Sequence, residues 1–201
     1  PICRLILHNR DRYMNAMLYE YVNKGDTHAA FRAARGLCND HLSRLQSMPG
    51  NALGVSLLMH GVLHEVLTVT PAAKSGGLGR LFKRAGGEDT AEALEPVGPC
   101  IICKNMDAVE ESYLDVLKIY YGDKLLDGLR ESPGGLCLPH YRMALRRLPD
   151  ATQLVQIQQA HWERLYAQVG EFIDRINLVA GNLHDLSTHE SDDSWRRAIR
   201  Y

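Results

Sequence analysis

A cysteine and histidine pattern that occurs twice restricts what this chain can fold into more than any other feature. The tripeptide Gly-Leu-Cys, followed three residues after its cysteine by a histidine, appears near the start and again near residue 137. Flanking cysteines and tyrosines recur at almost the same offset, close to 100 residues. Because distinctive residues rarely fall in step by chance, the sequence predicts an internal duplication. The corresponding residues are Cys3 and Cys103, Tyr13 and Tyr113, Tyr21 and Tyr121, Cys38 and Cys137, and His41 and His140.

The second copy of the pattern contains a full set of ligands for one metal ion. Cys100 and Cys103 form a Cys-x-x-Cys motif, in which two thiolates can approach one ion from a tight turn. Cys137 and His140 follow 34 residues later and supply a third thiolate and an imidazole. Three thiolates and one imidazole suit tetrahedral zinc. We therefore expect these four residues to bind a single ion that holds a helical hairpin together.

The first copy offers Cys3, Cys38 and His41 for a second ion. The counterpart of Cys100 would fall one position before Pro1. Either the native protein has a cysteine there, or this site has an open position for water or substrate, as catalytic zinc sites do. The first alternative is favoured, because Pro-Ile-Cys resembles the remainder of a Cys-Pro-Ile-Cys motif.

Zinc is the favoured metal, because it is redox-silent and accepts this ligand set. An iron–sulfur cluster is the alternative, although such clusters are usually held by four thiolates. A further site is conceivable at His60, His64 and His161, since two histidines four residues apart lie on one helix face. A partly buried histidine with an ordinary hydrogen-bonding partner is the simpler interpretation of each.

Apolar residues in both halves recur at helical spacing, and few segments alternate as strands do. Glycine and proline concentrate between the halves, which indicates a linker. We expect an all-α fold in which duplicated helical hairpins form a bundle held together by the metal sites. Glu110 and Glu111 are expected on a solvated helix face, and Asp150 at the cap of a long helix. The predicted segments are a first repeat (1–69), a flexible linker (70–99), a second repeat (100–183) and a polar tail (184–201).

The overall composition points to no specific class of ligand. Lys+Arg number 23 and Asp+Glu 24, so the net charge of −1 gives no general attraction to nucleic acid or anionic lipid. The most apolar stretch, residues 53–69, contains two histidines and a glutamate and is shorter than a membrane span, so we expect a buried helix and no transmembrane segment. Cysteines at ligand spacing indicate thiolates in a reducing compartment, which predicts a cytoplasmic protein.

The motifs, together with Asn51-Ala52-Leu53-Gly54, resemble those of an uncharacterised bacterial family, number 6062 among the domains of unknown function. The resemblance extends to about Arg175 and implies a bacterial or archaeal source and a metal-binding scaffold, with no assigned activity. The cysteine expected before Pro1 is the one departure, and it concerns only the first ligand set.

Three functions are compatible with these features. The favoured one is a non-enzymatic helical scaffold that contains two zinc ions and binds an unknown protein partner. The second is an iron–sulfur protein for electron transfer or redox sensing. The third is an enzyme that uses an open metal position, either at the first site or around the additional histidines.

Overall fold

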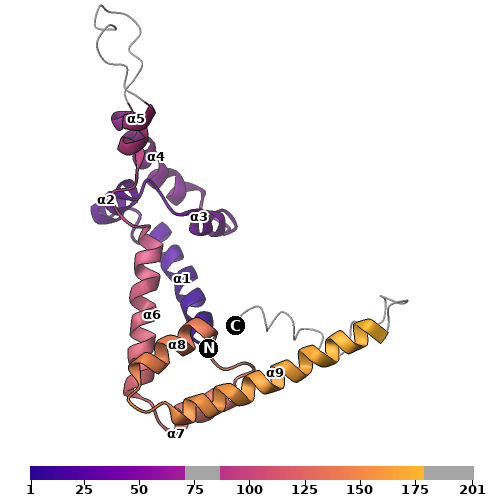
Figure 1. Cartoon of the computed structure of the whole chain (residues 1–201). Coiled ribbons are helices and arrows are strands. Elements are labelled where there is room, and N and C mark those ends of the chain that lie inside the picture. The colour runs from indigo at the N-terminus through magenta and orange to yellow at the C-terminus, as the bar shows by residue number, and fades with distance from the viewer. Residues whose placement is uncertain (71–86, 179–201) are drawn as a thin grey trace, which may run out of the picture. The chain divides into compact units, whose positions relative to one another are not determined.

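The computed structural model describes residues 1–70 and 87–178, and within them the protein is entirely helical. This confirms the predicted all-α class. The helices of the described residues are α1 (Ile2–Tyr19), α2 (Gly25–Ala33), α3 (Asn39–Gln46), α4 (Ala52–Val69), α5 (Gly87–Leu94), α6 (Ile101–Ile119), α7 (Asp123–Glu131), α8 (Leu138–Arg147) and α9 (Thr152–Leu178) (Figure 1).

The chain divides into two compact units. Unit 1 comprises Pro1–Ile6 and Glu110–Tyr201, and unit 2 comprises Leu7–Val109. Helices α1 and α6 each contribute residues to both units. The units therefore do not coincide with the predicted segments 1–69 and 100–183, and the duplication of helical hairpins stays a prediction.

Unit 2 is built around the side chains that α1, α2 and α4 turn toward one another. Gly54 allows α4 to lie directly against α1, because a Cβ at this position would stand 2.8 Å from the carbonyl oxygen of Leu18. Helix α2 packs along α4, and α5 packs on α4 from within the segment predicted as a linker (Figure 1). The core side chains of this unit are Met14, Met17, Leu18, Val22, Phe31, Leu45, Met48, Leu58, Val62 and Ile102.

Unit 1 has its core between α7, α8 and the first half of α9. Tyr141 of α8 meets Trp162 of α9 edge to face, with the ring centroids 5.2 Å apart. The carboxylate of Asp150 accepts a hydrogen bond from the backbone N–H of Thr152 at 2.9 Å, which caps the start of α9 as expected. From residue 162 to 175 no side chain of α9 is buried. The predicted polar tail lies outside the described residues.

Helix α4 corrects one expectation from the sequence. The apolar segment 53–69 was expected to be a buried helix, yet the buried residues of α4 are only Gly54, Leu58 and Val62. Its exposed face includes Leu53 and Leu67, which are 74% and 76% exposed. An apolar composition around the whole helix is typical of burial, so the prediction was reasonable but wrong for half of the helix surface.

Candidate metal centres

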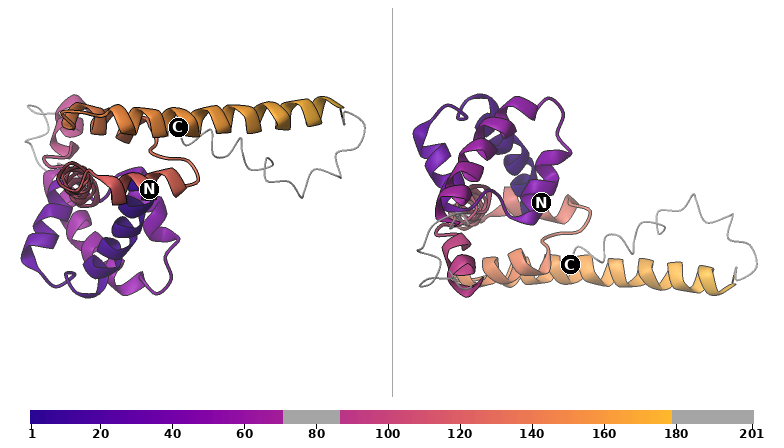
Figure 2. Two further views of the ribbon diagram at one scale, coloured as in Figure 1. Left: turned by 90° about the horizontal axis from the view of Figure 1, so that it is seen from below. Right: turned by 90° about the horizontal axis from the view of Figure 1, so that it is seen from above.

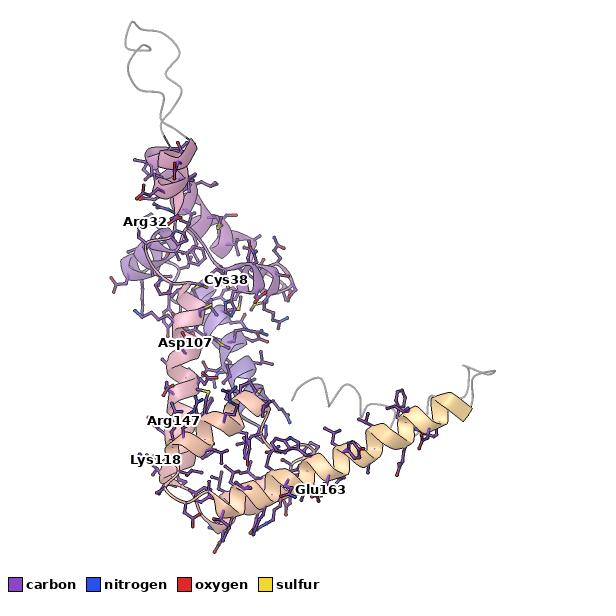
Figure 3. The ribbon with its side chains drawn as sticks, in the orientation of Figure 1. Arg32, Cys38, Asp107, Lys118, Arg147 and Glu163 are labelled. Carbon is purple, nitrogen blue, oxygen red and sulfur yellow. The ribbon has the colours of Figure 1, made fainter. Side chains whose placement is uncertain are left out.

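Four predicted ligands converge in unit 2, where they form the α3–α6 cluster: Cys38, His41, Cys100 and Cys103. Their four ligand atoms all lie within 4.8 Å of one another. The Nδ1 atom of His41 is 3.1 Å from the sulfur of Cys38 and 3.4 Å from that of Cys103. The sulfur of Cys38 is 3.7 Å from that of Cys103, and the sulfur of Cys100 is 3.7 Å from Nδ1 of His41. Figure 3 labels Cys38 near the N-terminal end of α6.

These separations fit a single tetrahedral ion. Zinc bonds of about 2.3 Å to sulfur and about 2.0 to 2.1 Å to nitrogen place neighbouring sulfurs about 3.8 Å apart and a sulfur about 3.6 Å from the nitrogen. The four separations given above differ from these values by at most about half an ångström, and the other two are below 4.8 Å. The donor set of three thiols and one imidazole therefore has both the chemistry and the spacing to hold one zinc-sized ion.

Three further ligands converge in unit 1, where Cys3, Cys137 and His140 form the α1–α8 cluster. The two sulfurs are 3.1 Å apart, and Nδ1 of His140 is 3.2 Å from the sulfur of Cys3 and 2.8 Å from that of Cys137. Both Figure 1 and Figure 2 show the N-terminal end of the chain beside α8. These atoms must move apart by about 0.4 to 0.8 Å to accommodate zinc.

The ligands are grouped differently from the expectation. We predicted Cys100 and Cys103 to share an ion with Cys137 and His140, but the structure brings them together with Cys38 and His41. Each Cys-x-x-His motif is combined with the cysteines that come from the other half of the sequence. The predicted grouping within each half is therefore wrong.

The lengths of the helices explain this exchange. Helix α6 starts at the Cys-x-x-Cys motif, and its 19 residues extend for about 28 Å. Helix α7 has nine residues and covers about 13 Å, which is too short to lead the chain back along α6 before Cys137. A hairpin of two matched helices was assumed from the 34-residue separation. The same mismatch occurs in the first half, where α1 has 18 residues and α2 has nine.

All the cysteines of both clusters are placed by the beginnings of helices. Cys38 and Cys137 occupy the N-cap positions of α3 and α8, with nearly identical extended backbone angles (φ −64°, ψ 161° and φ −66°, ψ 156°). Cys100 immediately precedes α6, and Cys3 and Cys103 lie in the first turns of their helices. Helix N-termini carry partial positive charge, which stabilises thiolates. The helix N-termini therefore reduce the cost of a thiolate once an arriving ion has displaced its proton.

Glycine shapes the turn in front of each Cys-x-x-His motif. Gly36 and Gly135 both have positive φ angles, 107° and 64°, which favour glycine. The turn of Gly135 is further fixed by Gln158, whose side-chain oxygen Oε1 accepts a hydrogen bond from the backbone N–H of Leu136 at 2.9 Å. This turn delivers the next residue, Cys137, to the start of α8.

Burial shifts the pKa of three of the ligands, Cys3, Cys103 and His41. Burial, with contributions from Cys38 and Cys100, raises the pKa of Cys103 to about 12. Burial and the neighbouring thiol likewise raise the pKa of Cys3 to about 11. Burial, together with the charge of Arg10, lowers the pKa of His41. At neutral pH these sulfurs are therefore thiols whose protons an arriving ion must displace, and the imidazole of His41 is neutral.

Comparison with known proteins agrees with the resemblance seen in the motifs. Residues 1–201 match the family described as "Family of unknown function (DUF6062)". The chain belongs to DUF6062. No curated protein and no solved structure matches it significantly. Membership of DUF6062 comes with no assigned activity, so the chemistry of the two clusters is the available guide to function.

One residue of this DUF6062 chain that the sequence interpretation missed lies behind His140. Nε2 of His140 donates a hydrogen bond to the carboxylate of Glu110 at 2.8 Å. Such a bond fixes the ring tautomer and leaves Nδ1 free to face the sulfurs. Glu110 was expected on a solvated face, and its side chain is still 31% exposed; its contact with His140 was not expected. Its neighbour Glu111 is more exposed and pairs with Arg147.

A repeat offset of 100 could have identified Glu110. Its counterpart is Arg10, whose charge acts on His41 and lowers the pKa of that imidazole. Arg10 of α1 therefore acts on His41 of one cluster with a positive charge. Glu110 of α6 acts on His140 of the other cluster with a negative charge. The signal was hidden because a charged residue on an amphipathic helix is ordinarily solvated.

The three additional histidines do not meet in one site. His161 belongs to unit 1, is buried, and its Nε2 donates to the carbonyl oxygen of Leu129 at 2.8 Å. This is the simpler role expected for it. His60 and His64 belong to unit 2 and are exposed on α4. Among the described residues, no group of three or more potential ligands includes any of them.

Proposed function

We propose that this protein binds two zinc ions that stabilise a helical scaffold, and that the scaffold acts by binding a protein partner in a reducing compartment such as the cytoplasm. The observation that carries the proposal is the α3–α6 cluster. There, three thiols and an imidazole from two helix N-termini lie at tetrahedral spacing around one point. Two separate patterns in the sequence contribute to it, so chance proximity is a poor explanation.

Zinc fits the α3–α6 cluster better than an iron–sulfur cluster does. In an iron–sulfur cluster, ligands bound to different iron atoms stand further apart than the ligands of a single ion. All four ligand atoms of the α3–α6 cluster lie within 4.8 Å of one another. Iron–sulfur clusters are also usually held by four thiolates. Both the donor set and the spacing therefore favour zinc.

A structural role follows from what the clusters connect. Cys38 and Cys103 are 65 positions apart, and Cys3 and Cys137 are 134 positions apart. An ion bound at either place joins distant segments of the chain, and in such sites the free energy of metal binding contributes directly to folding. Four protein ligands also leave no coordination position for a substrate at the α3–α6 cluster. This supports a scaffold rather than an enzyme.

The predicted duplication belongs to the same proposal. It is supported by the matching N-cap geometry of Cys38 and Cys137. A duplicated scaffold needs two ions of the same kind for equivalent structural tasks. We therefore assign the same metal to both clusters.

Elemental analysis of protein purified without added metal tests the proposal. We expect two zinc ions per chain and no stoichiometric iron. Cys103→Ser should remove the ion of the α3–α6 cluster, Cys137→Ser that of the α1–α8 cluster, and each should lower the melting temperature. His8→Ala, at an exposed histidine outside both clusters, is the control and should keep both ions. A brown protein with iron and sulfide, or a protein without metal that melts like the cysteine variants, would overturn the proposal.

A further inference from the structure

Helix α4 presents an apolar face that no described residue covers. Along this face, side chains recur at intervals of four and three residues, which is the spacing of a coiled-coil seam. The outer positions are leucines, of which Leu53, Leu57 and Leu67 are 74%, 42% and 76% exposed. The two central positions are His60 and His64, both exposed. A contiguous apolar face of this kind on a folded unit indicates an interaction site.

The chemistry of this face limits what it can bind. The only Asp, Glu, Lys or Arg of α4 is Glu65, which lies toward α2 and pairs with Arg35. The exposed face therefore offers no charge to attract an acidic or basic partner. It also lacks the lysines and arginines that flank the apolar face of helices lying on anionic membranes.

By length and hydropathy alone, α4 is the one helix among the described residues that could cross a membrane. A role as a membrane span conflicts with its packing. Gly54 brings α4 against the backbone of Leu18, and the ion pair between Glu65 and Arg35 ties it to α2. Both contacts would be lost if α4 left unit 2. An apolar protein surface is the better occupant of the exposed face.

The two histidines identify that occupant. Histidines four residues apart on a helix can bind one metal ion from the same face. Within the described residues no hydrogen bond involves the imidazole of His60 or of His64, and both side chains are exposed, so both imidazoles are available. Tetrahedral zinc needs four ligands, and this pair supplies two. A second copy of the same helix, related by a twofold axis, supplies the other two.

Two copies of α4 can pair antiparallel about a twofold axis that passes between the two histidines. This pairing places His60 opposite His64 of the second copy, and Leu57 opposite Leu67 of the second copy. The four imidazoles then meet in the centre, with a leucine pair on either side. Isologous pairing of this kind is the commonest form of protein self-association.

The size of the face shows that the metal is required. Eighteen residues of α4 extend for about 27 Å, and a helix is about 10 Å wide, so the face covers on the order of 300 Å². A stable interface buries about 800 Å² on each partner. The apolar contact alone is therefore too small for a stable dimer, and association depends on the bridging ion.

We propose that His60 and His64 of two copies bind one zinc ion and close a metal-dependent α4 dimer. This zinc is additional to the ions assigned to the cysteine clusters and does not depend on them.

Sedimentation velocity of the full chain during a titration with zinc tests the proposal. The wild-type protein should pass from the 22.6 kDa monomer to a particle of twice that mass, with one additional zinc for every two chains. The double variant His60→Ala/His64→Ala should stay monomeric over the same titration. His8→Ala, which removes one exposed histidine of α1 in the same unit, should dimerise like the wild type.

A third variant separates the paired helix face from unspecific crosslinking by surface histidines. Leu57→Glu keeps both imidazoles but puts a carboxylate against Leu67 of the second copy, and it should need at least about tenfold more zinc to dimerise. A wild-type protein that stays monomeric at every zinc concentration would overturn the proposal. So would a double variant or a Leu57→Glu variant that dimerises like the wild type. Elemental analysis of the same samples reports the cysteine clusters separately, so their failure cannot be mistaken for failure of the dimer.

Discussion

Replacing Gly135 by alanine should destabilise unit 1 out of proportion to the single methyl group added. Gly135 has a φ angle of 64°, and a Cβ there would lie 2.6 Å from the side-chain oxygen Oε1 of Gln158 and 3.0 Å from Cδ2 of His161. Gln158 is 1% exposed, and its Oε1 accepts a hydrogen bond from the backbone N–H of Leu136. The added methyl group therefore forces the buried side chain of Gln158 to move away from the backbone N–H of Leu136.

Two costs determine the size of the effect. A left-handed backbone costs a residue with a side chain roughly 1 to 2 kcal/mol relative to glycine. A buried N–H that loses its acceptor costs about 1 to 3 kcal/mol, and the amide nitrogen of Gln158 already lacks a partner and offers no compensation. Together they predict a loss of about 2 to 5 kcal/mol in the free energy of unfolding.

Urea denaturation followed by the fluorescence of Trp162, in a Trp195→Phe background, measures this loss in unit 1. Gly128→Ala in α7 is the control in the same unit, because its added Cβ meets no atom within 4 Å. It should raise stability by about 0.5 to 1 kcal/mol, since alanine favours a helix interior more than glycine does. If Gly135→Ala unfolds at the same midpoint as the wild type, the turn before Cys137 does not need glycine and the reasoning fails.

Three further predictions concern metal affinity and pH. Glu110→Gln should weaken metal binding at the α1–α8 cluster about 10- to 100-fold through its hydrogen bond to His140, whereas Glu111→Gln should not; competition with a chromophoric chelator measures both. Because the pKa of Cys103 is raised to about 12, binding of metal should release protons and weaken as pH falls, which calorimetry in buffers of different ionisation enthalpy detects. The pKa of Asp150 is lowered by its hydrogen bond from the backbone N–H of Thr152. Its contribution to stability is therefore present above the ordinary aspartate pKa of about 3.9 and is lost as pH falls through the lowered value. Asp150→Ala should remove this part of the acid dependence of unfolding, which circular dichroism measures.

Local features of the clusters could be predicted from the sequence because they depend on a few neighbouring residues. The Gly-Leu-Cys-x-x-His pattern predicts a turn, an N-terminal cysteine and a helix, and α8 begins directly after Cys137. The cap at Asp150 follows from similar short-range chemistry. In each case the hydrogen bonds or the required backbone angle lie within about one helical turn of the residue concerned.

Features that depend on tertiary packing could not be predicted in this way. The apolar composition of α4 indicates burial but does not say that only the face with Leu58 and Val62 is covered. The sequence pattern identifies Glu110 only as a polar residue on a helix. Its role becomes visible only from its position beside His140. Helix α5 forms inside the glycine-rich segment, which was expected to be linker throughout.

The pairing of the four motifs illustrates why sequence separation was a poor guide. The predicted partners Cys103 and Cys137 are 34 residues apart, whereas the observed pairs are separated by 65 and 134. Each doubling of a loop adds only about 0.6 kcal/mol to the cost of closing it, so the two observed pairings cost about 0.6 and 1.2 kcal/mol more than the predicted one. Such differences are small beside the free energy of binding a structural zinc ion, roughly 10 to 16 kcal/mol. The cost of loop closure therefore does not decide which cysteines share an ion. The unequal lengths of α6 and α7 decide it.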